Sequence, residues 1–159
     1  MKRDEPAPRW SWAHFDGLGP GDLYDILELR TAVFIVEQHC AYQDTDGADR
    51  VAHHLWARGQ DGKIAAYLRV VPPGIKYSEP SLGRIATSLS SRRTGLGRAL
   101  VREGIARAER LYGPCPIRIG AQRYLLKFYA EFGFVSTGFE YDEDDIPHTE
   151  MLREASRKT

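Results

Sequence analysis

The sequence predicts an α/β fold, in which strands and helices alternate along the chain. Between residues 82 and 121 a short apolar strand, a turn rich in glycine and arginine, an amphipathic helix and a second strand follow one another, as in a β-α-β unit. Upstream, an Asp-Gly pair between two apolar runs predicts an antiparallel hairpin over residues 51–71. A chain of 159 residues, 42% of them hydrophobic, can bury the core of such a domain. We therefore expect a mixed, mostly antiparallel central sheet with flanking helices.

The first half of the chain is predicted to form a strand, a helix and the hairpin. Aromatic and polar residues alternate over residues 9–15, as in a half-exposed strand. Pro20 opens a helix that is expected to run to about residue 36, because apolar residues recur there at nearly helical spacing. The two hairpin strands are expected over residues 51–57 and 64–71, and a proline pair ends the second strand.

The middle of the chain is predicted to form the β-α-β unit. Residues 82–87 read as a short buried strand, and the helix over residues 96–112 keeps its apolar residues on one face until Gly113 stops it. The strand over residues 116–121 should run parallel to residues 82–87, because a crossover through a helix returns the chain in the same direction.

The last elements are predicted to be a short helix and a closing pair of strands. Residues 124–132 form an aromatic helix that Gly133 caps. Two antiparallel strands are expected over residues 134–141 and 149–153, around the acidic stretch Asp142–Asp145.

Composition narrows the classes of protein. Lysine and arginine together number 22, as do aspartate and glutamate, so no net charge attracts nucleic acid or an anionic membrane. Cys40 and Cys115 cannot form a disulfide framework, and no apolar run is long enough for a membrane helix.

Residues 1–8 are charged and contain proline, so we expect a flexible arm, followed by a single domain over residues 9–159 in a cytoplasmic protein.

An acidic loop at residues 44–49 resembles a calcium-binding loop. Calcium loops end on a glutamate, but the twelfth position here, counted from Asp44, is Leu55. We therefore expect no metal site.

The turn before the predicted helix at Leu96 is typical of a phosphate-binding loop. Gly95 and Gly97 let the backbone approach a ligand closely, and the first N–H groups of a helix have no internal acceptor. The helix start also carries partial positive charge, which favours a phosphate or pyrophosphate. The turn holds three arginines as well: Arg92, Arg93 and Arg98. The alternative interpretation of this turn is the solvated start of an ordinary helix that binds no ligand.

Two common nucleotide motifs do not fit this turn. The dinucleotide fingerprint needs a third glycine where Leu100 stands, and the P-loop needs a lysine, which is absent between Lys76 and Lys127. The motif that does fit is R-x-x-G-x-G over residues 92–97, which resembles the acetyl-CoA pyrophosphate loop of the GNAT acyltransferases.

Other motifs extend this resemblance over most of residues 22–153. The segment Phe128–Phe134 looks like the second GNAT signature, and the order of the predicted elements matches GNAT topology. Lys127 stands where many GNAT proteins carry asparagine. The chain is similar to the ElaA-type GNAT proteins in five further segments: Leu29–Gln38, Tyr42–Gly47, Gly83–Ile85, Gly120–Gln122 and Asp145–His148.

The resemblance implies a coenzyme site between two parallel strands that splay apart. The pantetheine arm would lie beside the strand over residues 82–87, in which Ile85, Ala86 and Thr87 can all donate N–H groups. One of these groups would also stabilise the thioester oxygen. The other residues expected to bind acetyl-CoA as a co-substrate are Arg92, Arg93, Thr94, Gly95, Leu96, Gly97, Arg98, Gln122 and Phe128.

The resemblance also implies catalytic roles. Tyr129 is the candidate general acid for the departing thiolate, with a packed core aromatic as the alternative reading. The attacking amine must lose a proton, and Glu37 is the first candidate base, because burial at the apolar helix end would raise its pKa. His148 is the second candidate.

The expected activity is transfer of an acetyl group from acetyl-CoA to a primary amine of a small molecule or peptide, by direct attack in a ternary complex. Two alternatives stay open: a CoA-binding sensor without turnover, and an enzyme like the acyl-homoserine-lactone synthases, which share the pattern R-x-x-V-F-x-x-E at residues 30–37. No nucleic-acid or membrane partner is expected, and both a monomer and a homodimer stay open.

Overall fold

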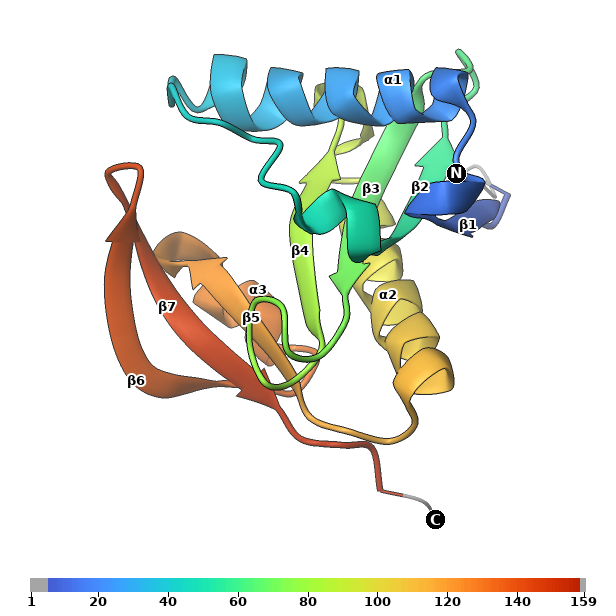
Figure 1. The fold of residues 1–159 in the computed structure, drawn as a ribbon. Coiled ribbons are helices and arrows are strands. Elements are labelled where there is room, and N and C mark those ends of the chain that lie inside the picture. Colours follow the sequence, from blue (N-terminus) through green and yellow to red (C-terminus); the bar gives the residue numbers. More distant parts are fainter. Residues whose placement is uncertain (1–5, 158–159) are drawn as a thin grey trace, which may run out of the picture.

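In the computed structural model, which describes residues 6–157, seven strands form two antiparallel sheets (Figure 1). The predicted α/β class is confirmed. The first sheet has the order β1 (Trp10–His14), β2 (His53–Arg58), β3 (Ile64–Val71) and β4 (Ser81–Thr87). The second sheet has the order β5 (Ile117–Gln122), β7 (Ile146–Arg153) and β6 (Phe134–Glu143).

Strands β4 and β5 lie side by side in the middle of the molecule and diverge along their length (Figure 1). A backbone hydrogen bond links β5 to the residue just before β4, where the N–H of Arg118 donates to the carbonyl of Pro80 at 3.1 Å. Beyond this bond the two strands form no ladder, and the sheets separate. The splay that the resemblance implied is thus present, and it divides the expected central sheet into two.

Helices cover both faces of the first sheet, which explains why every residue of β3 is buried. Residues Ile26 and Leu29 of α1 (Pro20–Arg30) pack on one face against Tyr67. On the other face, α2 (Leu96–Tyr112) packs against Leu68. A Cβ on Gly104 would lie 2.6 Å from a methyl carbon of Leu68, so this glycine sets the close approach of α2.

The helix predicted over residues 20–36 is present, but its last part has a different geometry. From Thr31 to Glu37 the chain forms a π-helix, η2, which continues directly from α1. Its wider spacing extends past the element, where the N–H of Cys40 donates to the carbonyl of Ile35 at 3.2 Å. π-Helices are rare and frequently occur at functional sites.

The C-terminal half follows the prediction with longer strands. The predicted aromatic helix consists of a 3-10 turn, η5 (Arg123–Leu125), and α3 (Leu126–Ala130). Strands β6 and β7 include most of the stretch expected to be a loop, and the chain reverses at Asp144 and Asp145, both with positive φ. This is the pattern of a two-residue hairpin turn, in which aspartate tolerates left-handed backbone.

The structure bears on two further features, the predicted N-terminal arm and the presence of membrane-spanning helices. Most of the flexible arm predicted over residues 1–8 lies outside the described residues, and residues 6–9 have no regular structure. Within residues 6–157, no helix combines the length and the apolar content needed to cross a bilayer.

Candidate functional site

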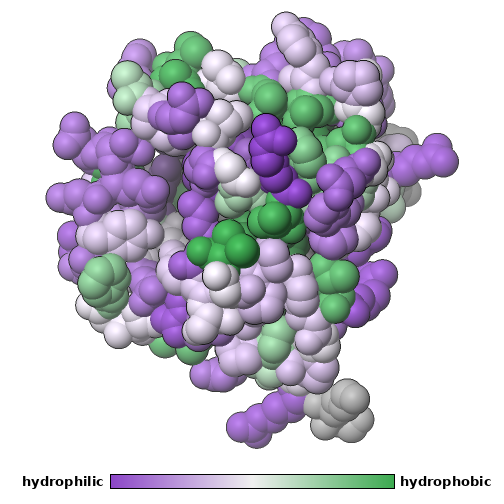
Figure 2. Space-filling view, viewed as in Figure 1, coloured by the Kyte–Doolittle hydropathy of each residue, from purple (hydrophilic) through white to green (hydrophobic). Residues whose placement is uncertain are grey.

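A cavity of about 740 Å³ opens where β4 and β5 diverge. Figure 2 shows the surface hollowed between the lobe of β6 and β7 and the middle of the molecule. The walls come from β4, β5, the turn before α2, the end of η2, η5 with α3, and the β6–β7 hairpin. The predicted site residues in the wall are Glu37, Ile85, Ala86, Thr87, Arg92, Arg93, Gly95, Gly97, Arg98, Gln122, Phe128, Tyr129 and His148.

Two predicted coenzyme-binding residues, Thr94 and Leu96, do not line this cavity. The hydroxyl of Thr94 donates to the carbonyl of Ser91 at 2.6 Å and accepts from the N–H of Leu96 at 3.3 Å. The side chain of Leu96 packs against the main hydrophobic core. Thr94 therefore stabilises the turn by local hydrogen bonds, and Leu96 anchors it to the core.

The turn before α2 has the backbone geometry that the glycines predicted. Gly95 adopts a left-handed conformation, with φ of 88°, which favours glycine. The N–H groups of Gly97 and Arg98 find no acceptor within residues 6–157, since the first bond of the helix runs from Ala99 to Gly95. Two unpaired amides therefore lie at a helix start that lines the cavity, which suits a phosphate group.

The edge of β4 corrects one expectation. The N–H of Ser88 donates to Ala65 of β3 at 2.9 Å, and successive amides of a strand point to opposite edges. The N–H of Ala86, which pairs in register with Tyr67, therefore also points to β3. Only the amides of Ile85 and Thr87 point toward β5, so the three residues cannot all donate to a ligand.

A buried ionic cluster holds β4 in this position. Arg84 has a φ of 50°, and the register of β3 against β4 shifts at this point. Its Nε lies 2.8 Å from Oδ1 of Asp44, and its Nη2 donates to the carbonyl of the same residue at 3.1 Å. Asp44 also binds Arg30, which is fully buried. The predicted calcium-like loop therefore binds arginines and anchors the strand that borders the cavity.

The other two carboxylates of the cluster are bound in the same way. Burial raises the pKa of Asp46, but hydrogen bonds from Arg69 and Lys76 outweigh that effect and lower it. Asp49 is similar: burial raises its pKa, and the ion pair with Arg30 lowers it overall. All three aspartates of the cluster thus have cationic side chains as partners.

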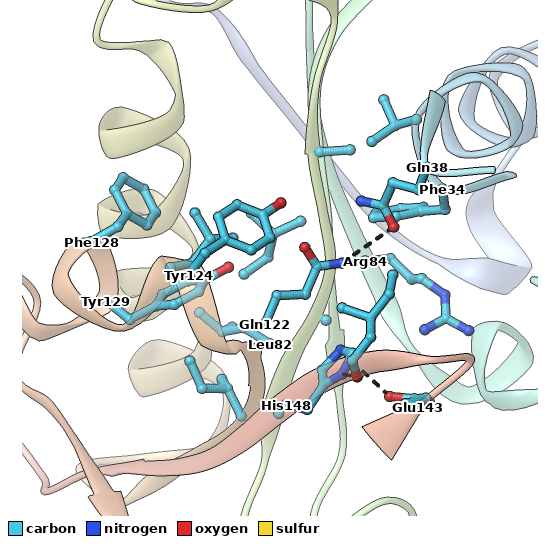
Figure 3. Close-up of a pocket in the computed structure, with 18 of the residues that line it drawn as sticks. Phe34, Gln38, Leu82, Arg84, Gln122, Tyr124, Phe128, Tyr129, Glu143 and His148 are labelled. Carbon is cyan, nitrogen blue, oxygen red and sulfur yellow. Dashed lines mark hydrogen bonds and ion pairs between the residues drawn. The ribbon is translucent and has the colours of Figure 1, made fainter. Parts of the chain in front are cut away.

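Tyr129 points from α3 into the cavity toward β4 (Figure 3). Its ring is 6% exposed and packs edge-on against Phe128 and Phe134. Within residues 6–157 its hydroxyl has no hydrogen-bond partner, and burial raises its pKa well above the ordinary tyrosine value. The phenol therefore stays protonated, and its O–H is available to a ligand.

Glu37 differs from expectation. Arg92 approaches it with both terminal nitrogens, one of them at 2.8 Å, and this hydrogen bond lowers the pKa of the carboxyl although burial acts in the opposite direction. The expected rise of its pKa is wrong, because the partner arginine outweighs a small desolvation effect.

His148 lies on the opposite wall, where its ring stacks on Tyr141. Its Nδ1 is 2.7 Å from the carbonyl of Ile146, and its Nε2 is 3.8 Å from a carboxylate oxygen of Glu143 (Figure 3). A carbonyl only accepts, so Nδ1 carries the hydrogen. The lone pair of the neutral ring is therefore on Nε2.

Among the cavity residues that sequence reasoning missed, Arg84, Tyr141 and Gln38 carry polar groups. Arg84 and Tyr141 lie in segments used only for their resemblance or their strand pattern, and Gln38 accepts a 3.2 Å hydrogen bond from Gln122 across the opening (Figure 3). Gln38 joins η2 to β5, which no local pattern indicates.

The comparisons with known proteins agree with this architecture. A family model described as the acetyltransferase (GNAT) domain matches residues 25–155, and the chain belongs to the GNAT acetyltransferase family. An acyl-CoA N-acyltransferase from Pseudomonas aeruginosa superposes with a TM-score of 0.87 at 40% identity, over 92% of this chain and 99% of that one.

Within the family, the chain is similar to the ElaA proteins, as its motifs suggested, and to the UPF0039 proteins. ElaA of Escherichia coli is 34% identical over 91% of this chain and 95% of its own length, and its crystal structure superposes with a TM-score of 0.86 over 93% and 100% of the two chains. A UPF0039 protein of Synechocystis is 41% identical over 90% of this chain and 93% of its own length.

Proposed function

We propose that the protein is an acetyl-CoA-dependent N-acetyltransferase that acetylates a primary amine of a small molecule or peptide by direct attack in a ternary complex. The observation that carries the proposal is the cavity itself. One continuous cavity wall contains unpaired helix-start amides, the outward amides of β4 and the buried hydroxyl of Tyr129.

The residues present fit the coenzyme. The amides of Gly97 and Arg98 would bind its diphosphate, with Arg93 beside them, and the amides of Ile85 and Thr87 would donate to its pantetheine arm. The coenzyme supplies an acyl group activated as a thioester. An N–H placed to donate to the thioester oxygen is worth about 2.7–4 kcal/mol in enzymes from which such a donor has been removed.

Tyr129 is the proposed proton donor to the departing thiolate. Burial raises the pKa of the phenol and makes it a weaker acid, but the same apolar surroundings make a neighbouring thiolate more basic. Burial thus raises the pKa of both the proton donor and the proton acceptor. The hydroxyl therefore remains a suitable donor at the moment when negative charge forms on sulfur.

His148 is the proposed base for the amine, in preference to Glu37. A lysine-like amine has a pKa of about 10.4 and is mostly protonated near neutral pH, so a proton must leave before attack. Both oxygens of Glu37 face Arg92, whereas Nε2 of His148 has a lone pair and lies in the cavity wall. A carboxylate oxygen of Glu143 lies 3.8 Å from Nε2.

The test combines binding and turnover. Calorimetry should show that CoA binds, and a panel of primary amines with acetyl-CoA should release free thiol. Replacement of His148 by glutamine should reduce thiol release by about 10²-fold and leave CoA affinity unchanged. Tight CoA binding without thiol release over the whole panel would favour the sensor. Turnover only with S-adenosylmethionine would favour the synthase.

A further inference from the structure

An ion pair forms part of the cavity wall. Glu37, the last residue of η2, pairs with Arg92 of the turn before α2, 55 positions later in the chain. Two nitrogens of the guanidinium contact the two carboxylate oxygens, and Arg92 also donates from Nη2 to the carbonyl of Thr87 at 3.3 Å. The two side chains are 35% and 34% exposed, so solvent and ligands can reach the pair.

The residues after Glu37 anchor the chain segment from which its side chain extends. Gln38 accepts the hydrogen bond from Gln122 of β5, and the thiol of Cys40 lies 3.6 Å from the carbonyl of Asp144 at the hairpin turn. Residues 37–40 thus contact three different walls of the cavity. These contacts anchor the backbone that follows Glu37, beside the turn that carries Arg92.

The pair competes with an anionic ligand. A guanidinium presents its N–H groups in a planar fork that fits either a carboxylate or a phosphate, and the same face cannot bind both at full strength. Arg92 is the first residue of the phosphate-binding turn, and it lines the same cavity as the unpaired amides at the start of α2. Glu37 therefore occupies the part of Arg92 that a diphosphate would use.

We propose that Glu37 is a positioning residue that holds Arg92 in the coenzyme-free protein. When the coenzyme binds, the ion pair breaks and Arg92 binds the diphosphate instead. The proposal rests on the proposed function, because it requires that the turn binds CoA. It assigns Glu37 an effect opposite to that of an ordinary binding residue: the carboxylate lowers the affinity for CoA.

The direct test is the affinity of E37Q for CoA by calorimetry. Glutamine has nearly the same shape and cannot neutralise Arg92, so the dissociation constant should fall by about two- to fivefold, the range that a half-exposed ion pair allows. E79Q is a matched control. It removes a carboxylate that contacts two nitrogens of Arg118 at 2.8 and 2.9 Å, outside the cavity wall, and it should leave the affinity unchanged.

A double-mutant cycle separates this contact from a general effect of charge. R92A should bind CoA more weakly than the wild type, and E37Q should bring no further gain in the R92A background, because Glu37 acts through Arg92. An affinity of E37Q equal to or weaker than that of the wild type would overturn the proposal, as would a gain that persists without Arg92. If the wild type does not bind CoA at all, the proposed function fails as well.

Discussion

Gly120 of β5 leaves the space that the hydroxyl of Tyr141 occupies. A Cβ at Gly120 would lie 2.1 Å from the hydroxyl oxygen of Tyr141, much closer than two such atoms can approach. Tyr141 comes from β6 and stacks on His148, with ring centroids 5.4 Å apart. A glycine in one strand thus allows a tyrosine from another to support the proposed base.

We expect G120A to impair turnover more than coenzyme binding. The new methyl group must displace the Tyr141 ring and with it the stacking partner of His148, so kcat/KM for an amine should fall by about tenfold. The affinity for CoA should stay within twofold, because the phosphate-binding turn lies elsewhere. Steady-state thiol release and calorimetry measure the two quantities.

The second variant for this test is G120A combined with Tyr141→Phe. Removal of the hydroxyl removes the atom with which the new Cβ collides, so the double variant should recover part of the lost activity. Full activity of G120A alone would show that the position of Tyr141 does not matter for the reaction.

Elements with strong local signals could be predicted from the sequence. The Asp-Gly turn located the β2–β3 hairpin, and Gly113 fixed the end of α2 at Tyr112, because both signals act within a few residues. The π-helical end of α1 could not be predicted in this way. It leads into residues 37–40, which contact three distant segments, and apolar periodicity does not report such contacts.

The site shows the same limit. The motifs predicted that Arg92, Gly95 and Tyr129 lie at one site, and all three line the cavity. This succeeded because chain order in this fold fixes where each element lies. The pKa of Glu37 was predicted with the wrong sign, since the partner that lowers it is 55 residues away in sequence. The direction of the Ala86 amide depends on the register of β4 against β3, which burial patterns leave undetermined.

Tyr129→Phe should separate chemistry from binding. The ring packing against Phe128 and Phe134 is retained, so the variant should fold and should bind CoA within twofold of the wild type. Loss of a general acid reduces rates by about 10²–10⁴-fold, and we expect kcat to fall by at least the lower figure. An unchanged kcat for thiol release would remove Tyr129 from the reaction.

Gly95→Val should weaken CoA binding. The φ of 88° at Gly95 is strongly unfavourable for a β-branched residue, at about 1–2 kcal/mol, and the side chain would stand where the backbone meets the ligand. The dissociation constant should rise by tenfold or more. Gly62→Val is the matched control: Gly62 has a φ of 80° in the β2–β3 turn, away from the cavity. It should lose similar stability and keep its CoA affinity.

His54 makes the stability of the fold depend on pH. It is fully buried, with Nε2 at 3.0 Å from the carbonyl of Asp49 and Nδ1 at 2.7 Å from the hydroxyl of Tyr67. The carbonyl only accepts, so Nε2 carries the hydrogen and Nδ1 accepts from the tyrosine. A second proton would break that bond next to Arg30 and Arg69. Burial accordingly lowers the pKa of His54, although the hydrogen bond to Asp49 opposes the shift.

The sign of the pH effect follows from this lowered pKa. In the unfolded chain a histidine titrates near pH 6.5, so below that pH the unfolded state binds a proton that the native state does not. The free energy of unfolding should be highest above pH 6.5 and should fall by up to about 1.4 kcal/mol per pH unit for each such histidine. Burial also lowers the pKa of His53, which adds to the same slope.

Urea denaturation at pH 7.5 and 5.5 measures the difference in the free energy of unfolding between the two pH values. His54→Gln should be less stable at pH 7.5 and should show a shallower slope, whereas an equal slope would mean that His54 is not its source.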